Sequence, residues 1–245
     1  CLRSKTSLSY IEIYIGRFPK VDQVIMKTAL LFGSSGLVGG HLLNQLIKDT
    51  NYSKIKLFVR SDPEISNPKV EVIKTDFNNL ENHKEDIKGD DCFVCIGTTK
   101  KNSPDKDDYR RVELDIPKEI AKIAKSNLVN SFIFVSALYA NPKSSGEYIR
   151  FKGLVEEELK ELNFPKLGIM RPSFLIGNRK EKRTSETIGI FVFNLISPLL
   201  LGPLKKMKPI HSETVAKAMI RAANENLEKN VFESNEIDKL VLNQS

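Results

Sequence analysis

The sequence predicts a doubly wound α/β fold with a mostly parallel sheet in a single domain. Short apolar runs alternate with helical patterns along most of the 245 residues, and this order favours right-handed crossovers. A glycine-rich turn follows the first apolar run, as in folds that bind a ligand at the strand ends. With 40% hydrophobic residues and no long Pro/Gly/Ser-rich linker, the chain can bury one substantial core.

The expected strands are continuously apolar, as strands buried on both faces of a parallel sheet should be. They are expected near 28–33, 55–60, 70–74, 92–97, 132–136 and 167–171. Apolar residues at intervals of three and four indicate helices between them. The expected helices cover 37–48, 116–124 and, in the tail, 212–223, followed by a short strand at 231–234 and a structural segment at 237–240.

Three spaced glycines after the first expected strand indicate a dinucleotide pocket. Gly33 would make the tight turn, Gly36 would let the backbone approach a pyrophosphate, and Gly39 would let helix and strand pack closely. The phosphates would lie on the helix N-terminus. An ordinary strand-to-helix loop stays an alternative, whereas a P-loop is disfavoured because no Gly-Lys-Ser or Gly-Lys-Thr follows. The candidate cofactor-binding residues in this turn are Gly33, Ser34, Ser35, Gly36, Leu37, Val38 and Gly39.

Ligands of such a sheet bind at the carboxyl ends of its strands, and one pocket would explain the residues found there. These residues are Gly33, Arg60, Asp76, Gly97, Ser136 and Arg171-Pro172. Arg60 could bind a 2′-phosphate where an acidic residue would bind a ribose 2′-hydroxyl, which favours NADP(H) over NAD(H). The nearby Asp62 and a solvated role for Arg60 keep the alternative open. Asp76 could meet the adenine end or cap the turn that follows it.

The chemistry is expected at a serine and at a tyrosine–lysine pair. Tyr148 and Lys152 are four residues apart and would share a helix face. The lysine ammonium and an oxidised nicotinamide would lower the phenol pKa, so that Tyr148 could act as general acid or base. Ser136 would hydrogen-bond the same substrate oxygen, and Lys152 would also hold the nicotinamide ribose. An amphipathic surface pair is the alternative interpretation.

The turn, the serine and the pair together resemble the short-chain dehydrogenase/reductase family over roughly residues 26–240. Several segments look like its atypical, Tat-interacting-protein-like branch: 95–100, 109–112, 142–145, 148–153 and 171–179. The resemblance implies an NADP(H)-binding, Rossmann-like protein whose Ser, Tyr and Lys are Ser136, Tyr148 and Lys152. Where many relatives carry Asn on the helix after the fourth strand, this chain has Glu113, which could replace the Asn in a proton relay or leave turnover slow or lost.

The resemblance also implies that Gly97-Thr98 passes beneath the nicotinamide and that Pro172 belongs to the loop closing over it. The remaining candidate cofactor-binding residues are Arg60, Asp76, Phe77, Cys95, Ile96, Gly97, Thr98, Tyr148, Lys152 and Pro172. The first functional hypothesis is an NADP(H)-dependent oxidoreductase acting on a carbonyl or alcohol. Its rival is a regulatory or redox-sensing protein that binds NADP(H) and acts through a protein partner.

The charge and the cysteine content indicate whether nucleic acid, a membrane surface or a metal is an expected ligand. The net charge of +7 suits a phosphate-bearing ligand, an acidic membrane surface or nucleic acid, but the lysines are scattered and no nucleic-acid-binding motif is present. Cys92 and Cys95 match a C-x-x-C spacing, yet on a strand they would point to opposite faces. With three histidines, none at ligand spacing, no metal site is expected.

The expected Rossmann-like domain covers 26–245, with one segment before it and a distinct C-terminal region within it. Residues 1–25 are expected to be an extension, whether an upstream read-through, a disordered arm or an edge strand at 11–15; they lack the apolar core of a secretory signal, so the sequence predicts a cytoplasmic protein. Residues 178–245 are expected to contribute the substrate side. There, 188–201 is apolar and could wall an apolar substrate cleft or form a subunit contact, and Lys205, Lys206 and Lys208 make peripheral membrane contact the weaker alternative.

Overall fold

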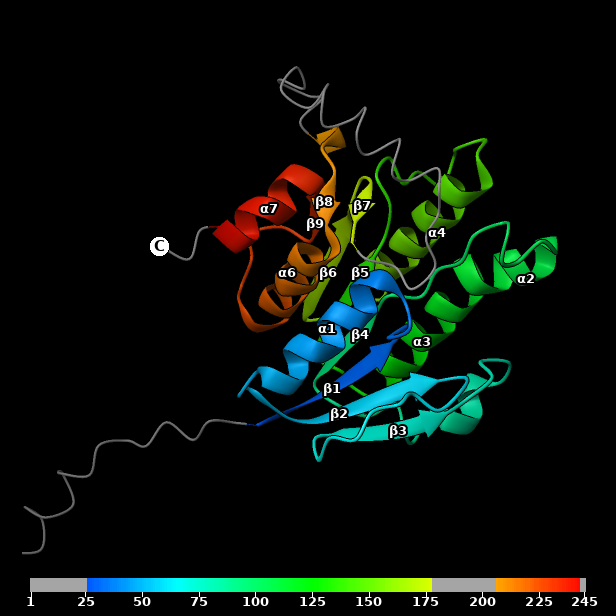
Figure 1. Cartoon of the computed structure of the whole chain (residues 1–245). Coiled ribbons are helices and arrows are strands. Elements are labelled where there is room, and N and C mark those ends of the chain that lie inside the picture. Colours follow the sequence, from blue (N-terminus) through cyan, green and yellow to red (C-terminus); the bar gives the residue numbers. More distant parts are fainter. Residues whose placement is uncertain (1–25, 178–205, 243–245) are drawn as a thin grey trace, which may run out of the picture.

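The computed structural model describes residues 26–177 and 206–242. Within these ranges, seven strands form one sheet in the order β3-β2-β1-β4-β5-β6-β9, and every neighbouring pair is parallel (Figure 1). The strands are β1 (Lys27–Phe32), β2 (Tyr52–Val59), β3 (Val70–Lys74), β4 (Asp91–Val94), β5 (Ser131–Val135), β6 (Lys166–Arg171) and β9 (Val231–Glu233). The predicted doubly wound α/β fold is confirmed.

Helices cover both faces of this sheet (Figure 1). One face carries α1 (Leu37–Lys48), α6 (Ser212–Asn224) and α7 (Ser234–Leu242). The other carries α2 (Lys106–Arg110), the π-helix η3 (Arg111–Asp115), α3 (Ile116–Ser126) and α4 (Glu147–Glu161). A short 3₁₀ turn, η2 (Leu80–His83), precedes β4, and β7 (Leu175–Ile176) pairs with β8 (Ile210–His211) outside the main sheet.

The core consists of two apolar layers, one on each face of the sheet. Along β1, Leu30 and Phe32 point into the layer under α3 and α4, whereas Leu31 points into the layer under α1 and α6. Phe32 also stacks on Phe58 of β2, with ring centroids 4.2 Å apart. Burial of each such side chain stabilises the folded state by roughly 1.5–3 kcal/mol. Both faces of the strand are therefore apolar, which is why its sequence shows no alternation of polar and apolar residues.

The strand order reverses at β1, which lies between β2 and β4. In open parallel sheets, ligands bind outside the strand ends at such a point. Gly33 follows β1, and the loop 95–98 follows β4. The Cys95 N–H donates to the Phe32 carbonyl at 2.9 Å, so the two loops begin side by side.

Some element boundaries differ from those expected. The strand expected at 92–97 ends at Val94, and the one at 28–33 ends at Phe32, because Gly33 has φ +88° and leaves the extended region. The segment 237–240 is part of α7. The short strands β7 and β8 and the π-helix were not expected, because two-residue strands and local π geometry leave no periodic signal.

The edge strand expected at 11–15, the apolar segment 188–201 and Lys205 lie outside the described residues. In the part of the chain that is described, no helix has the length and hydropathy needed to cross a bilayer.

Candidate active site

The glycine turn lies at the reversal point of the sheet. A Cβ on Gly33 would come within 2.7 Å of the Cys95 carbonyl, and the φ of +88° also disfavours any other residue there. A Cβ on Gly39 would overlap the Gly33 carbonyl oxygen, so α1 can pack onto the turn only with glycine at that position. Ser34 and Ser35 complete the turn.

The N-terminus of α1 has the features of an anion site. Gly36 is its N-cap residue, and among the described residues no side chain caps it and no acidic residue lies in its first turn. Leu37 and Val38 begin the helix. Free N–H groups at a helix N-terminus, approached over a glycine surface, fit a pyrophosphate. The residues predicted to cradle the cofactor phosphates are thus brought together by the fold.

The residues expected near the adenosine end have separate environments. Arg60 follows β2 directly and is exposed, and within 26–177 and 206–242 no hydrogen bond or ion pair is recorded for it. The nearby Asp62 carboxylate lies 2.5 Å from the Lys74 ammonium. Asp76 accepts hydrogen bonds from the backbone and side-chain nitrogens of Asn78, at 2.9 and 3.0 Å, and so caps the turn that follows it.

Phe77 and Cys95 lie in the loops that follow β3 and β4, against opposite core layers. Phe77 is buried with φ +63°, and its carbonyl accepts from Arg111 at 2.5 Å. Cys95 lies beside Met219 of α6, with the sulfur atoms 3.9 Å apart, and burial raises the pKa of its thiol to about 12. Such a thiol stays protonated at neutral pH and is not a nucleophile.

Tyr148 and Lys152 share the face of α4 that was predicted for them. The Lys152 ammonium lies 5.9 Å from the centre of the Tyr148 ring. Tyr148 is 39% exposed, whereas Lys152 is only 2% exposed. The ammonium lies 2.9 Å from Oε2 of Glu113 and donates to the Ile96 carbonyl at 3.4 Å. The fold therefore places a tyrosine, an ammonium and a carboxylate in one cluster at the ends of β4 and β5.

The pKa values within this cluster depend on burial and on Glu113. Burial by itself lowers the pKa of Lys152, but the Glu113 carboxylate, followed by Tyr148, outweighs it and leaves the pKa above its ordinary value. Burial raises the pKa of Tyr148, Lys152 lowers it and Glu113 raises it again, so the net direction is upward. The sequence predicts the opposite direction, because the Lys152 ammonium and an oxidised nicotinamide would both lower this pKa. In the protein alone, the phenol is protonated at neutral pH and is a proton donor.

Ser136 lies at the end of β5 but points into the interior. Its hydroxyl donates to Oε1 of Glu156 at 2.6 Å, and both residues are buried. Arg171 donates to the same carboxylate through Nε and Nη2, at 2.8 and 2.5 Å. Beyond Arg171, the Pro172 carbonyl accepts from Leu138 at 3.1 Å, which ties the loop after β6 to the loop after β5. The structure thus gives the Ser136 hydroxyl a partner two turns along α4 from Tyr148.

Sequence reasoning did not identify Glu156, and Glu113 was noted only through the resemblance. Glu156 stands four residues after Lys152, so the helical spacing from Tyr148 through Lys152 contained a signal for it. Glu113 is fully buried in η3, and its Oε1 accepts from the Thr98 N–H at 2.6 Å. The Thr98 hydroxyl lies 3.0 Å from that of Ser103.

The C-x-x-C spacing does not form a site. Cys92 points into the layer under α3 and α4, whereas Cys95 packs against the opposite layer, and both thiols are free. The predicted opposite placement of the two sulfurs is confirmed, although β4 ends at Val94 and Cys95 lies in the loop after it. Among the described residues, no group of three or more His, Cys, Asp or Glu side chains could hold a metal.

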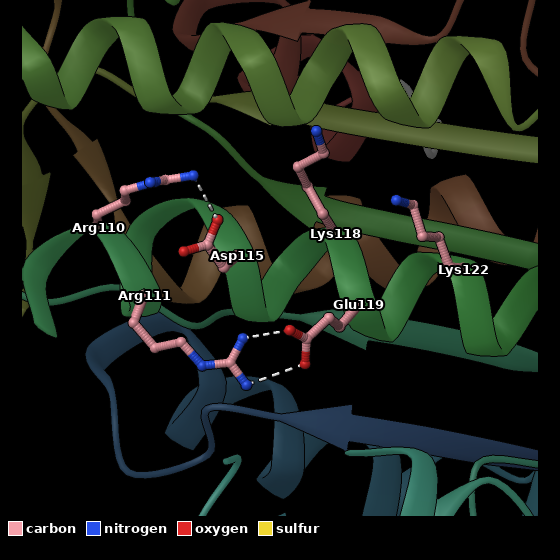
Figure 2. A pocket seen from close by; sticks show the side chains of 6 residues that line it. All are labelled: Arg110, Arg111, Asp115, Lys118, Glu119 and Lys122. Carbon is pink, nitrogen blue, oxygen red and sulfur yellow. Dashed lines mark hydrogen bonds and ion pairs between the residues drawn. The ribbon is translucent and has the colours of Figure 1, made fainter. Parts of the chain in front are cut away.

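A surface pocket of about 400 Å³ lies away from this cluster, on the outside of α2, η3 and α3 (Figure 2). Figure 2 shows two ion pairs among its lining residues, Arg110 with Asp115 and Arg111 with Glu119, and the Arg110–Asp115 distance is 3.5 Å. Its lining residues are Arg110, Arg111, Asp115, Lys118, Glu119 and Lys122, none of which belongs to the predicted site. All six lining residues are charged, whereas a typical small-molecule site is lined mostly by apolar and aromatic side chains.

Comparisons with known proteins indicate a nicotinamide-nucleotide-binding family. A family model described as NAD(P)H-binding matches residues 33–226. The chain is 30% identical to the mitochondrial protein FMP52-1 of Scheffersomyces stipitis, over 82% of this chain and 90% of that protein. It is 31% identical to protein HTATIP2 of Rattus norvegicus, over 66% of this chain and 69% of that protein.

Solved structures share the fold at lower identity. The Bordetella bronchiseptica enzyme WbmH in complex with NAD+ matches with a TM-score of 0.65 at 14% identity, over 85% of this chain and 75% of WbmH. The reductase domain of PhqB from Penicillium fellutanum matches with a TM-score of 0.63 at 17% identity, over 84% of this chain and 66% of that one. At these identities the likeness concerns the fold alone.

Proposed function

Because this chain belongs to the NAD(P)H-binding, atypical short-chain dehydrogenase/reductase family, we propose that it is an NADP(H)-dependent oxidoreductase acting on a carbonyl or alcohol. The observation that carries the proposal is the placement of Tyr148 beside Lys152 at the ends of β4 and β5. This cluster and the uncapped N-terminus of α1 lie at the strand ends on either side of the sheet's reversal point. A dinucleotide bound by its phosphates at α1 would extend toward the cluster.

In the proposed reduction, the cofactor, when bound, would supply a hydride for the carbonyl carbon. Tyr148 donates its proton to the carbonyl oxygen and is reprotonated from water, which balances the reaction. Lys152 stays charged beside Tyr148 and stabilises the phenolate that forms. Ser136 would hydrogen-bond the substrate oxygen only by releasing Glu156, so its part in the proposal requires a rotation of its side chain.

The preference for NADP(H) over NAD(H) rests on Arg60. Its guanidinium follows β2, where the second ribose of a dinucleotide is expected, and the competing Asp62 carboxylate is paired with Lys74. A guanidinium can bind a phosphate through two parallel hydrogen bonds. The small-molecule substrate is proposed to be apolar, because the aromatic side chains of Tyr139, after the end of β5, and Tyr148, at the start of α4, are exposed.

Calorimetric titration of the full chain with NADPH and with NADH tests the cofactor proposal. NADPH oxidation with a panel of aldehydes, ketones and quinones then tests the reaction. We expect tight binding of NADPH, weaker binding of NADH, and absorbance loss at 340 nm with at least one carbonyl class. If neither NADPH nor NADH binds, the proposal is wrong.

A regulatory protein that binds NADP(H) and acts through a protein partner is the second candidate. The observation that favours it is the engagement of Ser136 by Glu156, which leaves Tyr148 without the expected second donor to a substrate oxygen. Under this proposal, NADPH binds but no carbonyl accelerates its oxidation. Affinity capture with and without NADPH, followed by a direct binding assay of the purified partner, would separate the two candidates.

The cellular compartment of this protein is proposed separately from its activity. The sequence predicts a cytoplasmic protein, whereas the FMP52 relatives carry the description mitochondrial in their names. Fractionation of cells that express the full chain tests the prediction. Recovery with mitochondrial markers would contradict the cytoplasmic location.

A further inference from the structure

Glu113 joins three elements of the site from a fully buried position. Its carboxylate accepts the Thr98 N–H through Oε1 at 2.6 Å, and its Oε2 lies 2.9 Å from the Lys152 ammonium. Thr98 belongs to the loop after β4, Glu113 to η3 and Lys152 to α4. One side chain therefore fixes both the loop and the lysine.

The local chain holds Glu113 rigidly in this position. It lies in a π-helical turn between α2 and α3, and π-turns within helices often occur at functional sites. Before the turn, Asp105 caps α2 by accepting from Asp107 and Asp108 at 2.9 and 3.0 Å. Within it, Arg111 is anchored to Glu119 and to the Phe77 carbonyl. These contacts limit the freedom of the backbone that carries Glu113.

The ion pair lies against Gly97. A Cβ at that position would be 3.4 Å from Oε1 of Glu113 and 3.9 Å from the Lys152 ammonium. The loop residues 97–98 are those expected to pass beneath the nicotinamide. A change in the pair would therefore be transmitted to the loop directly.

Lys152 depends on Glu113 for its charge. In the described part of the chain, Glu113 is the carboxylate paired with it; the ammonium also donates to the Ile96 carbonyl and lies 4.9 Å from the centre of the Phe134 ring. A lysine that is only 2% exposed loses its proton readily when no opposite charge compensates burial. The charge that the mechanism assigns to Lys152 thus requires the Glu113 carboxylate.

We propose that Glu113 is a positioning residue that keeps Lys152 charged and in place, holds the Thr98 amide, and through both acts on Tyr148. Its role toward the cofactor rests on the proposed function, whereas its role toward Lys152 does not.

Other titratable groups also face the cluster. Burial raises the pKa of Tyr109 in α2 to about 12, and the nearby Glu113 and Tyr148 add to this increase. Cys95 beyond β4 also raises the pKa of Lys152, although less than Glu113 does. Both groups are neutral at pH 7, so Glu113 supplies the negative charge.

Lysine titration by NMR of the full chain, with ¹³C at the ε-carbon, tests the proposal without cofactor or substrate. Glu113→Gln should lower the pKa of Lys152 below its ordinary value of about 10.4, whereas Glu113→Asp should keep it high. Glu158→Gln removes a carboxylate paired with Lys118 and Lys122 and should leave Lys152 unchanged. The Lys152 signal is the one absent from the double variant Glu113→Gln/Lys152→Met. An unchanged Lys152 titration in Glu113→Gln would overturn the proposal.

NADPH calorimetry supplies the second readout. Glu113→Gln should weaken NADPH binding about tenfold, as expected if Lys152 loses its charge and with it a charged hydrogen bond to the nicotinamide ribose. Glu158→Gln should leave NADPH binding unchanged. If the wild-type chain binds no NADPH, the proposed function fails while the lysine titration still judges the role of Glu113. If Glu113→Gln does not fold, the double variant should recover folding because no uncompensated charge is left, and failure to recover would count against the pair.

Discussion

The Ser136 hydroxyl donates a 2.6 Å hydrogen bond to Glu156, inside the protein and two helical turns from Tyr148. The same carboxylate also accepts hydrogen bonds from Arg171 of β6. The serine that the sequence assigns to the substrate oxygen therefore also connects β5 to α4. This arrangement leads to the first prediction.

Ser136→Ala should lower the free energy of unfolding by about 1–2 kcal/mol, because the buried Glu156 carboxylate loses one of its donors while Arg171 remains. Urea denaturation at pH 7 measures the change. Ser145→Ala, in the exposed loop before α4, serves as the control and should have no effect. Equal stability of Ser136→Ala and the wild type would show that the hydrogen bond adds nothing to the fold.

Tyr148→Phe should lower turnover at least 100-fold, because loss of a general acid typically costs 10²- to 10⁴-fold. NADPH affinity should stay within about threefold of the wild type, since the phosphate-binding turn is untouched. Initial rates of NADPH oxidation and calorimetry provide the two measurements. Retained turnover would exclude Tyr148 as the proton donor.

Arg60→Ala should weaken NADPH binding by about 1.5–3 kcal/mol and leave NADH binding nearly unchanged, because only NADPH carries the 2′-phosphate. Calorimetry at fixed ionic strength measures both. Lys54→Ala, an exposed cation at the other end of β2, is the matched control. A parallel loss with both nucleotides would contradict the assignment of Arg60 to the phosphate.

Gly33→Ala should destabilise the protein by about 2–4 kcal/mol. The added Cβ would meet the Cys95 carbonyl at 2.7 Å and would hold alanine at φ +88°. Gly146→Ala, where a Cβ meets only the Ser144 hydroxyl at 3.6 Å, should cost much less. Thermal denaturation compares the two, and similar melting temperatures would be inconsistent with the tight turn.

Stability should fall in acid partly through Glu158. A hydrogen bond from Lys118 holds the pKa of this carboxyl below its ordinary value. Partial burial raises this pKa and Lys122 lowers it further, so the net direction is downward. A carboxyl with a depressed folded-state pKa contributes stability above its unfolded value near 4.3, and the contribution is lost as pH falls through the folded value.

Glu158→Gln should therefore cost roughly 1 kcal/mol at pH 7 and little near pH 3. Urea denaturation across this range measures the difference, with the exposed Glu157→Gln as control. A deficit that stayed constant with pH would mean that charge pairing is not its origin.

Sequence reasoning was most successful where local chemistry decides structure. The glycine turn, the apolar strands and the helix face of Tyr148 and Lys152 follow from backbone sterics, burial on two faces and the 3.6-residue repeat. These signals need only neighbours along the chain, so the sheet and the elements that carry the candidate site could be predicted.

The partners of the site residues depend on how the elements pack. Glu113 meets Lys152 across 39 positions, and Ser136 meets Glu156 across 20. Burial, with a smaller contribution from Glu113, reverses the direction in which Lys152 alone would shift the Tyr148 pKa. By itself the sequence determined which residues stand at the strand ends. Tertiary structure alone decided which charges face one another, because a buried pair forms only where separate elements bring its atoms within a few ångströms.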